Sequence, residues 1–60
     1  MEISEIEAGL QSLDSQDRLR AIAALRKEDA AVALPMLLTK VDDPEFMVRS
    51  FVAMALRQSQ

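Results

Sequence analysis

Residues 43–57 read DPEFMVRSFVAMALR, and this stretch predicts the clearest helix of the chain. Asp43 can cap the helix, Pro44 suits its first position, and Glu45 lies beside the positive end of the helix dipole. From Phe46 onward nearly every residue is apolar, and at the helical period these side chains span an arc of roughly 180–200°. One neighbouring helix cannot cover so wide an arc, so we expect packing partners on two sides.

A second stretch repeats this pattern. Residues 18–26 read RLRAIAALR and align with residues 49–57, RSFVAMALR, at a shift of 31 positions. The same shift superimposes the apolar positions of the segments that precede them. Ile3, Ile6 and Leu10 fall on Leu34, Leu37 and Val41. Because identities and apolar faces coincide, the chain is interpreted as one helix–turn–helix unit used twice.

Four helices and no strand are predicted, so the fold class is all-α. Their approximate ranges are 4–13, 15–27, 30–41 and 44–58. Ser4 and Glu7 form a capping-box pattern at the first start, Asp14 or Ser15 can cap the second helix, and Asp29 the third. The apolar faces of these helices give the expected core. It comprises Ile6, Leu10, Leu13, Ile22, Leu25, Leu34, Leu37, Leu38, Val41, Val48, Val52 and Leu56.

Two residues disturb the helical pattern. Gly9 lies inside the first helix, where it costs about 1 kcal/mol relative to alanine. It is either tolerated there or needed for a close helix contact. Pro35 lies inside the third helix and predicts a bend or a separate first turn, because proline removes one helical hydrogen bond.

The composition excludes most catalytic chemistry. The 60 residues include no Cys, His, Trp or Tyr, so a thiolate, imidazole or phenol cannot act here. We therefore predict that the chain is not an enzyme and binds no cofactor. The acidic residues Asp42, Asp43 and Glu45 are interpreted as helix capping rather than a metal site, because no glycine-centred loop gathers them.

The charge distribution argues against a nucleic-acid partner. The net charge is −3, and the basic residues between positions 18 and 27 are not interleaved with aromatic side chains. The longest apolar run, residues 30–38, is too short to cross a bilayer, and no secretory signal is recognisable. We expect a cytoplasmic protein without membrane insertion.

The second unit resembles a HEAT-like repeat, and more narrowly the short subtype of phycobilisome-lyase-type proteins in cyanobacteria. The residues that carry the likeness are 34–38 (LPMLL), 41–45 (VDDPE), Val48, Arg49, Ala53, Ala55 and Leu56. The first unit keeps Asp14, Arg18, Ala21, Ala24 and Leu25 but has no proline in its turn. The likeness covers nearly the whole chain, leaving out only residues 1–3 and 57–60.

This resemblance implies a short right-handed α-solenoid of two hairpins. The domain would span residues 1–60, with repeat 1 at about 1–28 and repeat 2 at about 29–60, and would form the N-terminal part of a longer array or a miniature completed by a partner. The family's structural ladder of aspartates and arginines maps onto Asp43 and Arg49, and less directly onto Asp14 and Arg18. An arginine fork that reaches a neighbouring loop would fix how the hairpins stack.

The predicted function is a non-catalytic protein–protein interaction or scaffold module. Solenoids need about three repeats, and here the last helix is the most apolar, so another protein or a second copy is expected to cover it. Arg20, Met47, Phe51 and Met54 are the candidate partner contacts. The alternative, implied by the resemblance alone, is a component of a phycobilin lyase or of phycobilisome assembly or turnover.

Overall fold

The computed structural model describes residues 1–58, and these form four α-helices joined by short loops without any strand. The helices are α1 (Ile3–Leu10), α2 (Ser15–Leu25), α3 (Ala30–Leu38) and α4 (Phe46–Gln58). The predicted all-α class is confirmed. The last two residues of the predicted domain, 59 and 60, lie outside the described residues.

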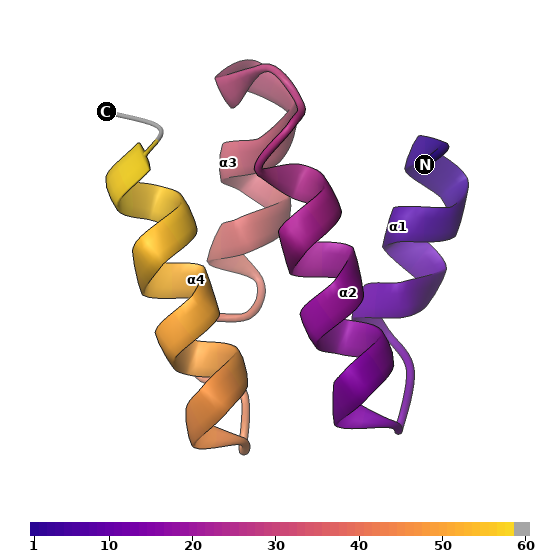
Figure 1. Cartoon of the computed structure of the whole chain (residues 1–60), viewed down its shortest axis with the longest axis vertical. Coiled ribbons are helices and arrows are strands. Elements are labelled where there is room, and N and C mark those ends of the chain that lie inside the picture. Colours follow the sequence, from indigo (N-terminus) through magenta and orange to yellow (C-terminus); the bar gives the residue numbers. More distant parts are fainter. Residues whose placement is uncertain (59–60) are drawn as a thin grey trace.

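Successive helices run up and down, and α2 lies between α1 and α4 (Figure 1). In this view α3 lies behind the pair formed by α2 and α4. α2 contacts all three other helices, and α4 packs against both α2 and α3, so the two packing partners expected for the last helix are present. The described chain measures 26 × 22 × 14 Å.

The helix starts follow the predicted caps in part. Asp14 caps α2 by accepting a hydrogen bond from the Gln16 amide at 2.9 Å. Asp29 precedes α3, but its side chain makes no capping hydrogen bond. The capping box of Ser4 and Glu7 was a wrong prediction, because α1 begins at Ile3 and both residues lie inside it.

The last helix begins later than predicted. The Arg49 amide donates to the Glu45 carbonyl at 3.1 Å, which makes Glu45 the residue just before the first turn of α4. Pro44 therefore lies in the preceding loop and not at the first helical position. The Asp43 carboxylate accepts from the Glu45 amide, so it still binds a free backbone donor near this helix start.

Three helices end earlier than predicted, at Leu10 instead of residue 13, at Leu25 instead of residue 27 and at Leu38 instead of residue 41. After each end, backbone amides bond to carbonyls three residues back, which tightens the chain into a turn. Leu13 and Val41 consequently lie beyond their helices. Their placement in the core was wrong, since Leu13 is 100% exposed and Val41 is 48% exposed.

The core draws on all four helices. Its buried apolar residues are Ile6, Leu10, Ala21, Ile22, Leu25, Ala33, Leu37, Val48, Val52 and Ala55. Leu34 and Leu56 are only half-buried, and the prediction of a core position for Leu38 was wrong because it is 57% exposed. The alanines were missed, because a small side chain adds little to an apolar pattern even where it lets two helices approach closely.

Gly9 provides one such close approach. A Cβ atom at this position would lie 2.9 Å from the Ala21 Cβ and 3.4 Å from the Asp17 carbonyl oxygen. Of the two roles predicted for Gly9, the structure supports the close contact, here between α1 and α2. Pro35 is exposed inside α3, which continues through it as a single helix, so the predicted separate first turn is absent.

Candidate interaction surface

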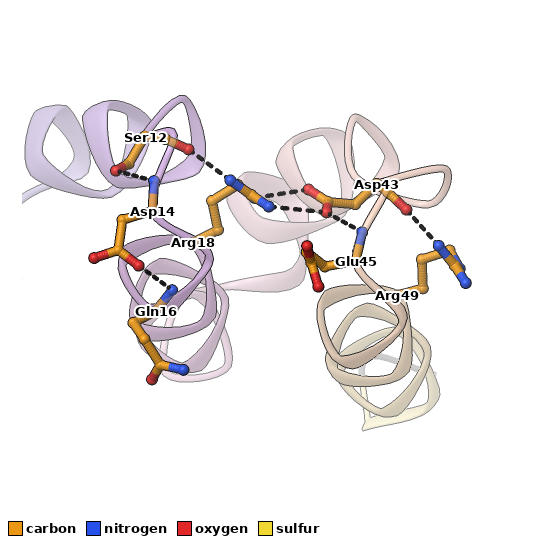
Figure 2. A network of polar contacts seen from close by, with 7 residues as sticks. All are labelled: Ser12, Asp14, Gln16, Arg18, Asp43, Glu45 and Arg49. Carbon is orange, nitrogen blue, oxygen red and sulfur yellow. Dashed lines mark hydrogen bonds and ion pairs between the residues drawn. The ribbon is translucent and has the colours of Figure 1, made fainter.

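The loop between α1 and α2 is closed by one arginine. Arg18 Nη1 donates to the Ser12 carbonyl oxygen at 2.8 Å (Figure 2). Within the loop the Asp14 amide donates to Ser12 Oγ at 3.1 Å, and Ser12 Oγ donates to Asp17 Oδ2 at 2.8 Å. The arginine thus fixes a loop of its own hairpin from a position one turn into α2.

The loop before α4 repeats these contacts at the 31-residue shift. Arg49 Nη1 donates to the Asp43 carbonyl oxygen at 2.7 Å, as Arg18 does to Ser12 (Figure 2). The Glu45 amide donates to Asp43 Oδ1 at 2.9 Å, as the Asp14 amide does to the Ser12 hydroxyl. Ser12 and Asp43 are therefore equivalent positions, and the internal repeat extends to the hydrogen bonds of the loops.

Arg18 also joins the two loops. Its Nη2 donates to Asp43 Oδ1 at 3.2 Å, and its Nε lies 2.9 Å from Asp43 Oδ2 in an ion pair that lacks hydrogen-bond alignment. Both residues are buried, with 8% of Arg18 and 5% of Asp43 exposed. One guanidinium thus connects the Ser12 carbonyl of the first hairpin to the carboxylate of the second.

The environment of Asp43 favours its charged form. Burial raises the pKa of this carboxyl, but the Glu45 amide, the Arg18 guanidinium and the charge of Lys40 outweigh it and hold the pKa below its usual value. Both carboxylate oxygens thus face groups of this chain, Oδ1 the Glu45 amide and Arg18 Nη2, and Oδ2 the Arg18 Nε. The role of Asp43 in this geometry is to hold the two hairpins together.

The predicted ladder is assembled in part. Arg18, Asp43 and Arg49 come together, although Arg49 reaches the backbone carbonyl of Asp43 and not its carboxylate. Asp14 instead caps α2. Ser12 was missed as a member of this network. The 31-residue shift places it over Asp43 and could have identified it.

The two arginines differ in what covers them. Arg18 is buried under the second hairpin, whereas the equivalent Arg49 is exposed. Besides the Asp43 carbonyl, its guanidinium carbon lies 5.8 Å from the centroid of the Phe46 ring. This distance permits a cation–π contact. No carboxylate pairs with Arg49 among the described residues.

The predicted partner contacts occupy separate places. Met47 and Met54 are exposed on α4, and Phe51 is half-buried against the core between them. Arg20 lies on α2 and pairs with Asp17. That hydrogen bond, with one from Ser12, lowers the pKa of the Asp17 carboxyl.

The hollows of the surface are shallow. One hollow of about 480 Å³ lies between α1 and α2, and no aromatic side chain lines it. Among residues 1–58, no group of three acidic side chains lies close enough to hold a metal ion. The helices of this part of the chain are also too short or too polar to cross a bilayer. The bilin-handling alternative stays a prediction from the sequence.

Comparisons with protein-family models, with curated proteins and with solved structures give no match for this chain. The resemblance to HEAT-like repeats therefore stays a prediction that rests on the residues quoted above. What the structure adds is the repetition of loop contacts at one spacing and a polar link between the two repeats.

Proposed function

We propose that this chain is a non-catalytic protein-interaction module, in which two HEAT-like hairpins stack as the start of a right-handed α-solenoid. The observation that carries the proposal is the exposure of large apolar side chains on the second hairpin. They are Val32, Leu38, Val41, Phe46, Met47 and Met54, with Phe46 the most exposed at 69%.

The distribution of these side chains supports the proposal more than their number. Single exposed apolar residues are ordinary, but several on one part of a small domain are typical of an interaction surface. The first hairpin exposes only Met1, Ile3 and Leu13 among its large apolar residues. Its surface around the hollow beside Gly9 carries the charged residues Glu5, Asp17 and Arg20 instead.

The repeated loop contacts support stacking of the hairpins. Arg18 ties the first hairpin to the second through a buried ion pair, and this connection is one that successive units of an array could repeat. We place the module in the cytoplasm, where small helical domains without disulfides are common.

A photo-crosslinking amino acid at position 54 tests the proposal. In extract of the source cells we expect a specific adduct. Excess unlabelled wild-type protein should compete this adduct away, whereas excess unlabelled variant with both Met47→Glu and Met54→Glu should not. The matched control carries the crosslinker at position 13, which is equally apolar and fully exposed but lies on the first hairpin.

Two outcomes would count against this function. One is equal labelling from positions 13 and 54. The other is a chain that sediments as a folded monomer at every concentration and yields no adduct that the unlabelled protein can compete away. Binding of the purified partner, measured by calorimetry with wild type and the double variant, then gives the affinity that α4 contributes.

A further inference from the structure

The two hairpins meet through one face of α2. Arg18 contacts Asp43, and Ile22 and Leu25 lie four and seven positions further along the same helix face. Both are fully buried in the core that α4 completes. On α1, Leu10 borders a hollow whose other side is formed by Pro35 and Met36 of α3. These residues together form the joining face of the first hairpin.

The second hairpin has the equivalent face, and within residues 1–58 no further hairpin covers it. At the 31-residue shift, Arg18, Ile22 and Leu25 correspond to Arg49, Ala53 and Leu56, and Leu10 corresponds to Val41. Arg49 and Ala53 are exposed, Val41 is 48% exposed, and Leu56 is half-buried. Leu38, at the position of Glu7, adds a further exposed apolar side chain. We call these five residues of the second hairpin the terminal face.

The opposite end of the molecule does not match the terminal face. Where the second hairpin offers the Asp43 carboxylate to an arginine, the first hairpin has Ser12, whose hydroxyl already donates to Asp17. The Asp17 carboxylate is also taken by Arg20. A second copy stacked head to tail would set Arg49 against a serine and apolar side chains against a charged pair.

Building on the function proposed above, we propose that the terminal face binds a helical hairpin of a partner protein. The loop of that hairpin carries a carboxylate. The carboxylate pairs with Arg49 as Asp43 pairs with Arg18. The helices of this hairpin present apolar side chains to Val41, Ala53 and Leu56, as α3 and α4 do to the first hairpin. The occupant is thus defined by one buried charge and an apolar surface around it.

The chain supplies its own probe for this chemistry. Appending a copy of residues 30–60 after Gln60 continues the 31-residue spacing and sets a hairpin with an aspartate in its loop against the terminal face. We expect the extended chain to unfold in one transition at a higher urea concentration than the 60-residue chain. A separate, earlier transition for the appended hairpin would overturn the proposal.

The decisive measurement is the loss of stability that Arg49→Leu causes in each of the two chains. In the 60-residue chain the change should alter the unfolding equilibrium constant by a small factor only, because Arg49 is exposed there. In the extended chain, Arg49→Leu should change the unfolding equilibrium constant by a factor at least ~10 times larger than in the 60-residue chain. The reason is that a buried carboxylate then lacks its partner. Changing the appended aspartate to asparagine should cost a similar factor, and the two losses should not add.

Arg20→Leu is the matched control, because it removes another exposed arginine, which lies at the far end of the molecule. It should have the same effect in both chains. Equal costs of Arg49→Leu in the two chains would refute the proposal. So would a dimer of the 60-residue chain that Arg49→Leu dissociates, because a second copy would then be the occupant. If this test fails while position 54 still gives its specific adduct, the interaction function stands and only the terminal face is wrong.

Discussion

Arg18 is the residue on which the arrangement of the two hairpins depends. Its guanidinium is the only cation that contacts the Asp43 carboxylate directly among the described residues, and it also binds the Ser12 carbonyl. Removing both charges of such a buried pair from water is costly, so the pair adds little compared with apolar side chains of the same shape. Losing one member is different, because the other charge stays buried.

Arg18→Leu should therefore destabilise the fold by about 3 kcal/mol, leaving Asp43 without its partner. Arg49→Leu, the equivalent change on the surface, should cost only about 1 kcal/mol, because it removes the hydrogen bond to the Asp43 carbonyl but leaves no charge buried without a partner. Urea unfolding followed by far-UV circular dichroism measures both. Since a domain of this size has a total stability of only about 3–9 kcal/mol, the first variant should be measured at low temperature. Equal costs for the two arginines would show that burial of the ion pair contributes nothing.

Asp43 should also make stability depend on pH. Its pKa is lower in the folded chain than its ordinary value of about 4, so folding favours the ionised form. Its contribution is complete above the unfolded pKa and is lost as the pH falls through the folded pKa. We expect the unfolding free energy to fall as the pH drops below about 4 in the wild type, and less steeply in Asp43→Asn. Identical pH profiles for the two proteins would contradict this account.

The contact between α1 and α2 depends on the absence of one methyl group. Gly9→Ala should gain about 1 kcal/mol of helix propensity but force the new Cβ against Ala21, 2.9 Å away. Because the Ala21 Cβ is fixed to its backbone, the helices must separate, at a cost of about 1–3 kcal/mol. We expect net destabilisation of about 1 kcal/mol by thermal unfolding. Adding Ala21→Gly should remove the clash.

The exposed neighbour Ala8 is the control for this prediction, since Ala8→Gly should show the propensity term alone. A Gly9→Ala protein as stable as the propensity term predicts would mean that α1 can move away from α2 without loss. In that case the close contact would be incidental.

Helix number and type followed from the sequence, but helix ends did not. The apolar period identified all four helices, because each needs one buried face. The ends of α1 and α3 are set by turns whose backbone amides bond three residues back, and the period of the side chains does not report this. Leu13 shows the consequence, since its spacing continues the face of α1 although the helix has already ended.

The polar network was predictable in part for a similar reason. The repeat marked Arg18 and Arg49 as equivalent, yet it could not show that only Arg18 is covered. That difference comes from what lies beyond each hairpin, not from its own residues. Ser12 was missed because a serine and an aspartate look unlike in sequence, although both accept a hydrogen bond from the amide two positions on.

The whole molecule has two unlike ends. On the side of α1, the surface carries Glu5 and the pair of Asp17 and Arg20. On the side of α3 and α4, Leu38, Val41 and Arg49 are exposed. In a head-to-tail stack of identical units the two ends are complementary, whereas here a charged end faces an apolar one and the two do not match. Association through the apolar end therefore does not imply endless head-to-tail growth.

The shared core predicts that the two hairpins unfold together. Ile22 and Leu25 of the first hairpin are fully buried in the core that includes Val48 and Val52 of the second, so either hairpin alone would expose most of its apolar face. The only aromatic residues, Phe46 and Phe51, both belong to α4. Fluorine NMR of fluorophenylalanine therefore reports on the second hairpin, whereas far-UV circular dichroism reports on all four helices.

The two probes should give the same urea midpoint in the wild type, because no state with only one folded hairpin is stable. Leu13→Ala should leave both midpoints unchanged, since the Leu13 side chain is fully exposed. A fluorine transition at lower urea than the dichroism transition would mean that α3 and α4 detach while α1 and α2 persist. The buried contact between Arg18 and Asp43 would then be too weak to couple the hairpins, and the first hairpin would be a domain in its own right.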